Sequence, residues 1–276
     1  MSRSQSEKAR NKLEKLLDHG RRNAWNPAHD VDWDKTSRTL EGLSRGEREA
    51  LASVLSLVFH SDSEGRNILE TICRCFDRTP SREILLGEKV HEFFLQQMDD
   101  EDRHASGLRL LFDRLGLEVE PRAMSQLFYS KILLSDRMLD AKLVLVYWYI
   151  EILAKGVFEQ LKMRFPDSCI DSLFTLIIKD EARHVGFGEI YMPLHVKEAR
   201  APQLGQMAVA YYSTAAALPA LFKFSHYAKA ARVLGFDLGH MFAKGMREVG
   251  SRASKLPATS GIIDLARAGD FVAALL

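Results

Sequence analysis

The sequence predicts an all-α protein built on a bundle of four long helices, with additional helices at both ends of the chain. Only 17 glycines and 8 prolines interrupt its 276 residues. Long windows show apolar residues recurring at intervals of three and four, as in amphipathic helices, and no segment has the alternation of a strand. With 46% hydrophobic residues the chain can bury one large core.

The chain is expected to form a single domain over residues 1–276. Residues 5–19 predict a charged helix, and residues 21–42 predict an irregular surface arm because they are rich in Asn, Asp, Pro and Gly. The bundle is expected to begin near Ser44. We therefore expect three parts, namely an N-terminal helix and arm (1–43), the bundle (44–196) and additional C-terminal helices (197–276).

Four segments are long enough to cross a domain as helices. They lie at about 44–77, 80–115, 136–165 and 168–196. Thr79 and Pro80 provide an N-cap followed by proline at the first helical position, and Pro166 to Ser168 restart the chain similarly. Residues 117–135 are expected to form a looser connection. Residues 200–248 predict two further helices before a Gly/Ser/Pro-rich segment and a short amphipathic tail.

Charge and hydropathy exclude several partners. The 38 basic and 37 acidic residues nearly cancel, so the basic surface typical of nucleic-acid or anionic-membrane binding is not expected. The longest apolar run, Leu143 to Ile150, is far shorter than the ~20 residues of a membrane span. The first ten residues carry no apolar signal segment, so we expect a cytoplasmic protein. Cys73, Cys75 and Cys169 fit neither a disulfide framework nor a zinc site and are expected in the core.

A short string occurs twice on two predicted helices. Asp100-Glu101-Asp102-Arg103-His104 recurs as Asp180-Glu181-Ala182-Arg183-His184, giving the pattern D-E-x-R-H in both places. Residues three apart share one face of a helix, so each Glu and His pair can bind the same metal ion.

Both pairs fall within apolar stripes, framed by Val90, Phe94 and Leu108 in the first helix and by Ile177 and Phe187 in the second. Buried carboxylates without partners cost several kcal/mol, and a bound cation is a common compensation. The alternative is a set of surface charges or structural ion pairs with the two arginines. Two copies at the centre of apolar faces favour a metal site.

Glu151 is the only acid in an otherwise apolar turn, thirty residues before Glu181. An antiparallel hairpin around Pro166 would bring these two residues to the same height in the bundle, where they can face each other. Glu151 is therefore a candidate ligand. The similar Glu88 to His91 string has its Glu off the apolar stripe and is expected in solvent.

The remaining helix should contribute one acid, and three compete. Glu64 is favoured because its distance to Pro80 resembles that from Glu151 to Pro166. Asp62 falls better on the apolar stripe if the helix is straight, whereas Glu64 needs a register shift. Glu70 lies too near the turn. The choice stays open between Glu64, Asp62 and Glu70.

One Glu from each of two helices and E-x-x-H from each of the others is the ligand pattern of ferritin-like di-iron and di-manganese proteins. The strings DEDRH and DEARHVGFGE resemble the ligand helices of bacterial multicomponent monooxygenases, aldehyde-deformylating oxygenase, arylamine N-oxygenases and ribonucleotide reductase small subunits. Ser63-Glu64-Gly65 resembles the first ligand helix of several of these. The likeness covers about residues 50–195.

The resemblance implies a ferritin-like four-helix bundle with a di-iron centre, or one containing manganese. Asp100 and Asp180 would then be hydrogen-bond acceptors that fix the opposite histidines. Glu101 and Glu181 are the candidate catalytic carboxylates. The complete implied ligand set is Glu64, Glu101, His104, Glu151, Glu181 and His184.

Two positions differ from the residue patterns of individual families, and these differences narrow the range of expected functions. Leu108 stands where ribonucleotide reductase small subunits carry their radical Tyr, and Ile177 stands where arylamine N-oxygenases carry an additional His. The resemblance implies a non-heme di-iron oxygenase or oxidase that activates dioxygen, takes electrons from a donor and oxidises a small organic substrate.

The alternatives are a ferroxidase or other iron-handling protein, and an oxidase like the ribonucleotide reductase small subunit. A purely structural helical protein with buried ion pairs is a third. A homodimer is an additional expectation. Aromatic residues near the motif are candidate pocket walls, although most of them are expected to belong to the core, namely Phe93, Phe94, Tyr147, Phe174 and Phe187.

Overall fold

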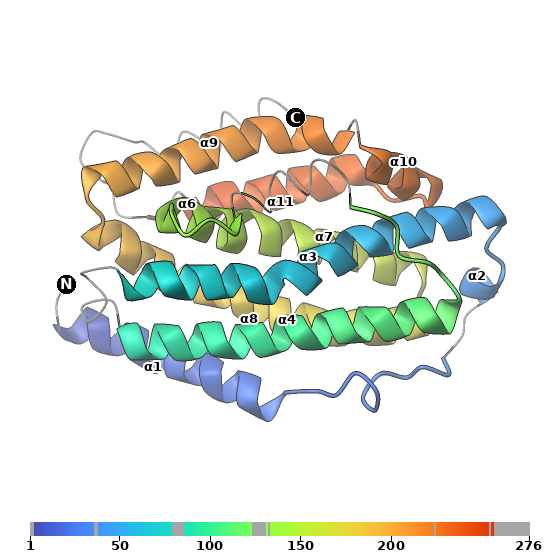
Figure 1. The fold of residues 1–276 in the computed structure, drawn as a ribbon, viewed down its shortest axis with the longest axis horizontal. Coiled ribbons are helices and arrows are strands. Elements are labelled where there is room, and N and C mark those ends of the chain that lie inside the picture. The colour runs from blue at the N-terminus through green and yellow to red at the C-terminus, as the bar shows by residue number, and fades with distance from the viewer. Residues whose placement is uncertain are drawn as a thin grey trace.

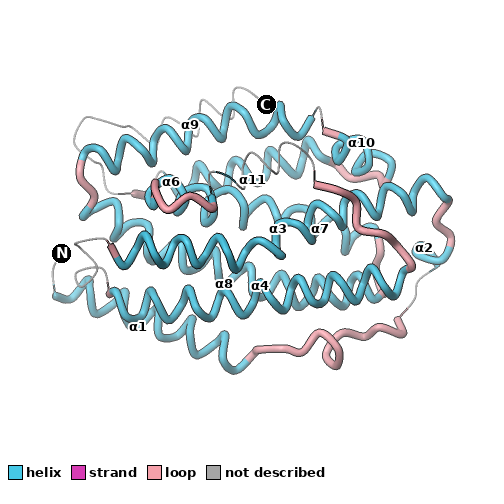
Figure 2. Tube along the Cα trace, in the orientation of Figure 1, coloured by secondary structure: helices cyan, strands magenta, loops and turns pink. Residues whose placement is uncertain are grey.

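The computed structural model describes residues 3–35, 38–78, 86–122, 131, 133–223, 225–253 and 255–256. Every regular element among them is helical, and none is a strand (Figure 2). The elements are α1 (Arg3–Arg22), α2 (Arg38–Glu41), α3 (Arg45–Asp77), α4 (Gly87–Leu115), α6 (Leu139–Val144), the π-helix η1 (Leu145–Ile150), α7 (Glu151–Arg164), α8 (Cys169–Glu198), α9 (Ala201–Lys223), α10 (His226–Val233) and α11 (Leu238–Ala253). The predicted all-α fold is confirmed.

Four long helical segments form the bundle. Helix α3 packs along α4, and α7 packs along α8, while α6, η1 and α7 follow one another in the chain as the third segment (Figure 1). Helix α1 covers α4 and α8 from outside, and the irregular residues after it run along the same side. The C-terminal helices cover other faces, with α9 against α6, α10 against α3 and α11 against α7.

Local signals explain two of the helix starts. Ser44 caps α3 with its side chain, which accepts a hydrogen bond from the backbone N–H of Glu47. The Glu47 side chain in turn accepts a hydrogen bond from the backbone N–H of Ser44. Ser168 caps α8 by accepting from the backbone N–H of Asp171. Both starts lie where the sequence predicted them.

Other boundaries differ from the prediction. Helix α4 begins at Gly87, and the proposed cap at Thr79 and Pro80 lies outside the described residues. The single helix predicted over 136–165 contains a π-helical segment. The stretch predicted as two helices forms three, because α10 and α11 are separated by a turn at Gly235, whose φ of 77° is in the left-handed region. The predicted amphipathic tail lies outside the described residues.

The apolar core is divided into two clusters. On α4 one cluster ends at Met98 and the other begins at Leu108, and on α8 one ends at Ile177 and the other begins at Val185. The three cysteines are buried in these clusters, as predicted. The candidate ligands of α4 and α8 therefore lie in a polar layer between two apolar regions.

No helix of the described residues is long and apolar enough to cross a membrane.

Candidate metal centre

The polar layer contains five of the six residues that the sequence placed at a metal site. Glu101 and His104 come from α4, Glu181 and His184 from α8, and Glu151 is the first residue of α7. All five are buried, and the two imidazole rings are fully enclosed. Because they are one turn apart on their helices, each Glu and His project to the same side.

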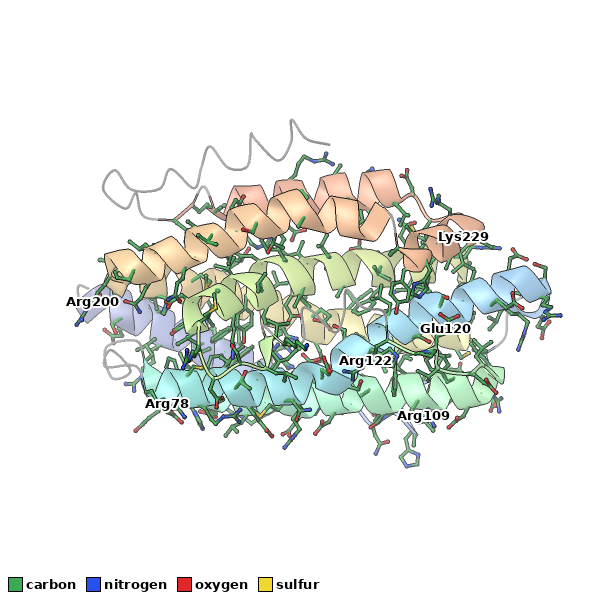
Figure 3. All side chains as sticks on the ribbon, turned by 45° about the horizontal axis from the view of Figure 1, so that its top comes forward. Arg78, Arg109, Glu120, Arg122, Arg200 and Lys229 are labelled. Carbon is green, nitrogen blue, oxygen red and sulfur yellow. The ribbon has the colours of Figure 1, made fainter. Side chains whose placement is uncertain are left out.

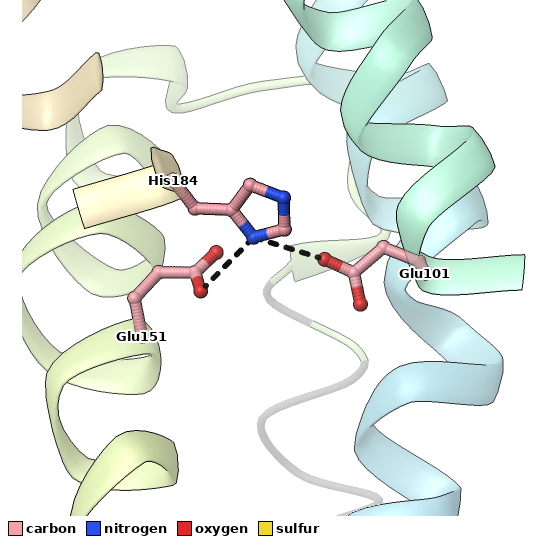
Figure 4. A group of neighbouring side chains, drawn as sticks. All are labelled: Glu101, Glu151 and His184. Carbon is pink, nitrogen blue, oxygen red and sulfur yellow. Dashed lines mark ion pairs between the residues drawn. The ribbon is translucent and has the colours of Figure 1, made fainter. Parts of the chain in front are cut away.

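Three of these residues present atoms to a common point. One donor atom each from Glu101, Glu151 and His184 lies within 4.8 Å of the others. His184 Nδ1 is 3.5 Å from Glu151 Oε2 and 3.9 Å from Glu101 Oε1, as Figure 4 shows. Glu181 joins them, since its Oε2 is 3.3 Å from the same nitrogen. Two carboxylates and an imidazole at this spacing can hold a metal ion.

His104 and Asp62 are two further buried residues that interact with Glu181. His104 Nδ1 makes no hydrogen bond and lies 3.5 Å from Glu181 Oε1. Asp62 on α3 is buried, and its Oδ2 also has no hydrogen-bond partner. Burial and the charge of Glu181 raise the pKa of Asp62 well above its usual value. These two buried, partnerless atoms fit a bound cation, since a metal ion satisfies an uncharged ring nitrogen and a carboxylate together.

The structure places the three candidate acids of α3 in different surroundings. Glu64 forms an ion pair with Arg122, which follows α4 (Figure 3 labels Arg122). Glu70 is about half exposed and pairs with Arg66 at 3.6 Å. The charge of Asp62 acts on Glu101, and the charge of Glu181 acts on Asp62. Helix α3 bends near its middle, as Figure 1 shows. The geometry of a straight helix therefore does not decide which of the three acids faces the bundle interior.

Each histidine is fixed by the aspartate of the other motif copy. His184 Nε2 donates to Asp100 Oδ2 at 2.9 Å, and His104 Nε2 donates to Asp180 Oδ2 at 3.2 Å. A carboxylate acceptor keeps a proton on Nε2, so Nδ1, which faces the carboxylates, is the nitrogen left for a metal ion. The crossed pairing that the resemblance implied is present.

The motif arginines neutralise these aspartates. Arg183 is buried and donates to Asp100, and Arg103 donates to the same carboxylate. The pKa of Asp100 is lowered although burial opposes this, because His184 and Arg183 stabilise the anion. The pKa of Asp180 is lowered for the same reasons, with His104 as its hydrogen-bond partner. Both aspartates are therefore available as acceptors near neutral pH.

The candidate ligand carboxylates Glu101 and Glu181 show the opposite behaviour. Burial and the neighbouring charge of Glu151 raise the pKa of Glu181 to about 8. Burial and the charge of Glu181 raise the pKa of Glu101 well above its usual value. The pKa of His184 is also raised, because the charge of Glu151 and hydrogen bonds outweigh burial. Without metal this cluster holds protons, which a divalent cation would displace.

The N-terminal arm contributes a residue that the sequence did not single out. Trp25 Nε1 donates to Asp180 Oδ2 at 2.8 Å, and its ring stacks on His104 with centroids 6.1 Å apart. An isolated Trp in a segment rich in turn residues gave no signal of this contact. The arm therefore covers one end of the site.

Gln97 is another residue that the sequence did not single out. It lies one turn before Glu101, and its Nε2 donates to Glu151 Oε1 at 2.8 Å. The four-residue spacing placed it on the face of Glu101, which was the available signal.

The π-helix η1 ends at the ligand of the third segment. The backbone N–H of Glu151 bonds to Val146 O, five residues earlier, instead of four. This wider turn changes which side chains face the centre, so Val146 and Tyr149 line an adjoining cavity while Tyr147 packs against Phe187. Single π turns inside helices are frequent at functional sites.

An apolar cavity of about 280 Å³ adjoins the polar layer. Asp62, Glu101, Glu151 and Glu181 form one wall. The rest is mostly aliphatic and aromatic, including Leu57, Val58, Ile68, Val157 and Phe242. The aromatic residues Phe93, Phe94, Tyr147, Phe174 and Phe187 do not line it; they are fully buried in the core, which was the alternative expected for most of them.

No protein-family model matches the sequence, and no curated protein matches it. Solved structures do match the fold. A variant of R2-like ligand-binding oxidase with an aerobically reconstituted Mn/Fe cofactor aligns with a TM-score of 0.65 and 15% identity, over 90% of this chain and 94% of that chain. The R2-like ligand-binding oxidase from Sulfolobus acidocaldarius aligns with a TM-score of 0.61 and 18% identity, over 95% of this chain and 93% of that chain. The predicted ferritin-like fold is confirmed.

Proposed function

We propose that this protein is a non-heme oxidase or oxygenase that uses a two-metal centre to react dioxygen with a small organic substrate. The observation that carries the proposal is the buried cluster of carboxylates and imidazoles that forms one wall of an apolar cavity. The names of the similar structures, which are oxidases reconstituted with a Mn/Fe cofactor, support it. Two irons are the proposed metals, with manganese as an alternative at either position.

Glu101, Glu151 and His184 would hold one ion, and Asp62, Glu181 and His104 the other. Asp62 replaces Glu64 in this set because its Oδ2 is buried without a hydrogen-bond partner, whereas Glu64 is paired with Arg122. Four carboxylates and two neutral imidazoles balance the charge of two divalent ions. Glu181 contacts both histidines, with Oε2 3.3 Å from His184 Nδ1 and Oε1 3.5 Å from His104 Nδ1, and Glu181 and Glu101 are the proposed catalytic carboxylates.

Two ferrous ions would supply the electrons that dioxygen accepts in this chemistry. The chain's own residues do the rest. Asp100 and Asp180 keep the protons of both rings on Nε2 and orient Nδ1 toward the centre. The apolar cavity wall excludes water beside the carboxylates and leaves room for an organic molecule.

The cavity favours an organic substrate over a ferroxidase role, because passage of iron ions needs polar groups whereas most of this wall is apolar. A role like that of the ribonucleotide reductase small subunit is disfavoured by Leu108, which replaces the radical tyrosine and is buried. An electron donor, a homodimer, a single domain over 1–276 and a cytoplasmic location belong to the same proposal.

Oxygen consumption tests the reaction type. Iron-loaded protein that is supplied with a reductant should consume oxygen slowly when no organic substrate is present. Oxygen consumption should accelerate when a small apolar alcohol, aldehyde or amine from a test panel is added, and that molecule should be recovered in oxidised form. Ala154→Phe would fill part of the cavity, so it should abolish the acceleration while two irons remain bound. Stoichiometric oxidation of added iron, unaffected by organic molecules or by Ala154→Phe, would instead establish a ferroxidase.

The choice of the α3 ligand is tested by a matched pair. Asp62→Asn should reduce the bound iron from about two ions per chain to about one, and Glu64→Gln should leave it unchanged, as measured by metal analysis after loading and desalting. Loss of an ion from Glu64→Gln, with Asp62→Asn unaffected, would return Glu64 to the ligand set.

A further inference from the structure

Gln97 is a fully buried amide inside the proposed metal centre. Its Nε2 donates to Glu151 Oε1 at 2.8 Å and lies 3.4 Å from Glu101 Oε1. The two contacts connect a ligand of α4 to the ligand of α7. A buried amide with two donors and one acceptor must have each satisfied, so its surroundings fix its direction.

Tyr147 supplies the third contact. Its hydroxyl donates to Gln97 Oε1 at 2.8 Å. In the reverse orientation the amide oxygen would face the two carboxylates of Glu101 and Glu151. Once a metal ion has displaced their protons, these carboxylates have no proton to donate and would repel the amide oxygen. Burial and the charge of Glu151 raise the pKa of Tyr147 well above its usual value, so the phenol stays a donor. The amide N–H groups are thereby directed at the carboxylates.

The ring of Tyr147 is itself held in place. It packs against Phe187 with centroids 4.9 Å apart and against Gly188 of α8. A Cβ at position 188 would lie 2.9 Å from Tyr147 Cβ, so alanine there requires the ring to move. Direct contacts therefore lead from Gly188 to Tyr147, from Tyr147 to Gln97, and from Gln97 to Glu151.

The two oxygens of Glu151 have different neighbours. Oε1 accepts from Gln97, whereas Oε2 lies 3.5 Å from His184 Nδ1, at the point where metal-donor atoms converge. An oxygen engaged by an amide is less available to a metal, so one oxygen is left for coordination. This division is visible before any metal binds.

We propose that Gln97, oriented by Tyr147, is a positioning residue that holds Glu151 to coordination through a single oxygen. The proposal rests on the proposed two-metal function. It assigns Tyr147 and Gln97 to the control of ligand geometry and gives neither a role as a ligand. Removing the amide would let Glu151 rotate and offer both oxygens.

Cobalt(II) titration of the metal-free protein tests this, because the visible absorption of Co(II) changes with coordination number. Gln97→Leu should shift and weaken the visible bands and lower the Co(II) affinity by about tenfold or more, as expected when a hydrogen-bond partner of a metal ligand is lost. Gln96→Leu is the matched control, because Gln96 donates to Leu17 O on the outer side of α4. It should leave both spectrum and affinity unchanged.

Two further variants keep the test decisive if Gln97→Leu fails to fold. Tyr147→Phe keeps the ring and removes the hydroxyl, and Gly188→Ala displaces the ring; both should produce the same spectral change at smaller amplitude. Gly186→Ala is the control for the latter, since a Cβ there would have ordinary contacts with Leu16 at 3.6 Å.

The outcomes separate the two proposals. Two Co(II) ions with an identical spectrum in wild type, Gln97→Leu, Tyr147→Phe and Gly188→Ala would overturn the role of Gln97 and leave the metal centre intact. No Co(II) binding to the wild type would overturn the proposed function itself. The positioning role is supported if the spectrum changes in each of the three variants that folds and stays unchanged in the two controls.

Discussion

The two copies of the D-E-x-R-H motif have the same local sequence and different surroundings. Asp100 in the first copy is fully buried and accepts from Arg103, Arg183 and His184. Asp180 in the second copy accepts from His104 and from Trp25 of the N-terminal arm. Both arginines thus donate directly to Asp100, whereas Arg183 and Arg103 lie farther from Asp180, at 3.4 and 3.7 Å, and Trp25 adds an uncharged donor there.

The rings of the two histidines are also enclosed differently. Trp25 stacks on His104 with an interplanar angle of 19°, whereas the edge of Phe93 meets His184 at 89°. An identical motif therefore determines which atoms meet at the centre, while residues distant in sequence determine how each half is covered. The stability of the protein should therefore respond differently when the same substitution is made in each of the two motif copies.

The largest difference is expected between Asp100→Asn and Asp180→Asn. Asp100→Asn leaves two arginines near a neutral amide, and breaking a buried ion pair costs about 3–5 kcal/mol. Asp180→Asn should cost roughly 1–3 kcal/mol, as for a lost partner in a hydrogen bond to a charged group. Urea unfolding of the metal-free variants measures both. Equal losses would mean that the two copies are equivalent.

Gly65 of α3 lies directly against Glu101 of the first copy, with no room for a side chain between them. No comparable contact is found between Glu181 and the glycines of the described residues. A Cβ at position 65 would lie 2.7 Å from Glu101 Cγ, so Gly65→Ala must displace this ligand. Overpacking of this kind costs about 1–3 kcal/mol, and we expect at least about tenfold weaker metal binding. Gly46→Ala on the same helix has open space around it and serves as the control. Unchanged affinity in isothermal titration of Gly65→Ala would show that Glu101 is not a ligand.

The pH dependence of stability tests the charge state of the second copy. The pKa of Glu181 is raised to about 8 in the folded protein, so unfolding releases its proton between about pH 4.5 and 8. The raised pKa of His184 acts in the same direction, because its stabilising charge is lost as the pH rises. The melting temperature of metal-free protein should fall by several degrees, at least about 3 °C, from pH 5 to pH 8.

A metal ion displaces these protons, so the stabilisation produced by metal should grow over the same range. Glu181→Gln removes the titrating carboxyl and should flatten the dependence in the metal-free protein. A melting temperature that rises from pH 5 to pH 8 in the wild-type protein without metal would contradict this charge state.

The smallest effect is expected from Trp25→Phe, which removes one hydrogen bond to Asp180 and keeps an aromatic ring over His104. The loss should be about 1–2 kcal/mol in urea unfolding, with metal content unchanged. Trp33→Phe is the comparison, since Trp33 Nε1 donates to Pro27 O away from the centre. A similar loss in both variants would remove the special role of Trp25.

Much of the bundle could be predicted because periodicity and caps are local. Ser44 and Ser168 begin helices where expected, and the motif spacing identified Glu101, His104, Glu181 and His184 as inward residues. Their role as ligands stays a prediction.

The remainder depends on contacts between distant segments. The bend of α3 and the arrival of Arg122 decide the surroundings of Glu64 and Asp62, and neither is encoded near those residues. The π-helix before Glu151 carries both Tyr149, which lines the cavity, and Tyr147, which packs against Phe187, and no local sequence pattern predicted this π-helix.

Anomalous X-ray diffraction from metal-loaded crystals, recorded at the iron and manganese absorption edges, tests the central claim most directly. The account predicts two peaks about 3.5–4 Å apart, typical of two-metal sites. It also predicts ligation by Nδ1 of both His104 and His184 and by Asp62 instead of Glu64. A single peak, ligation through Nε2, or no peak between Glu101 and Glu181 would contradict it.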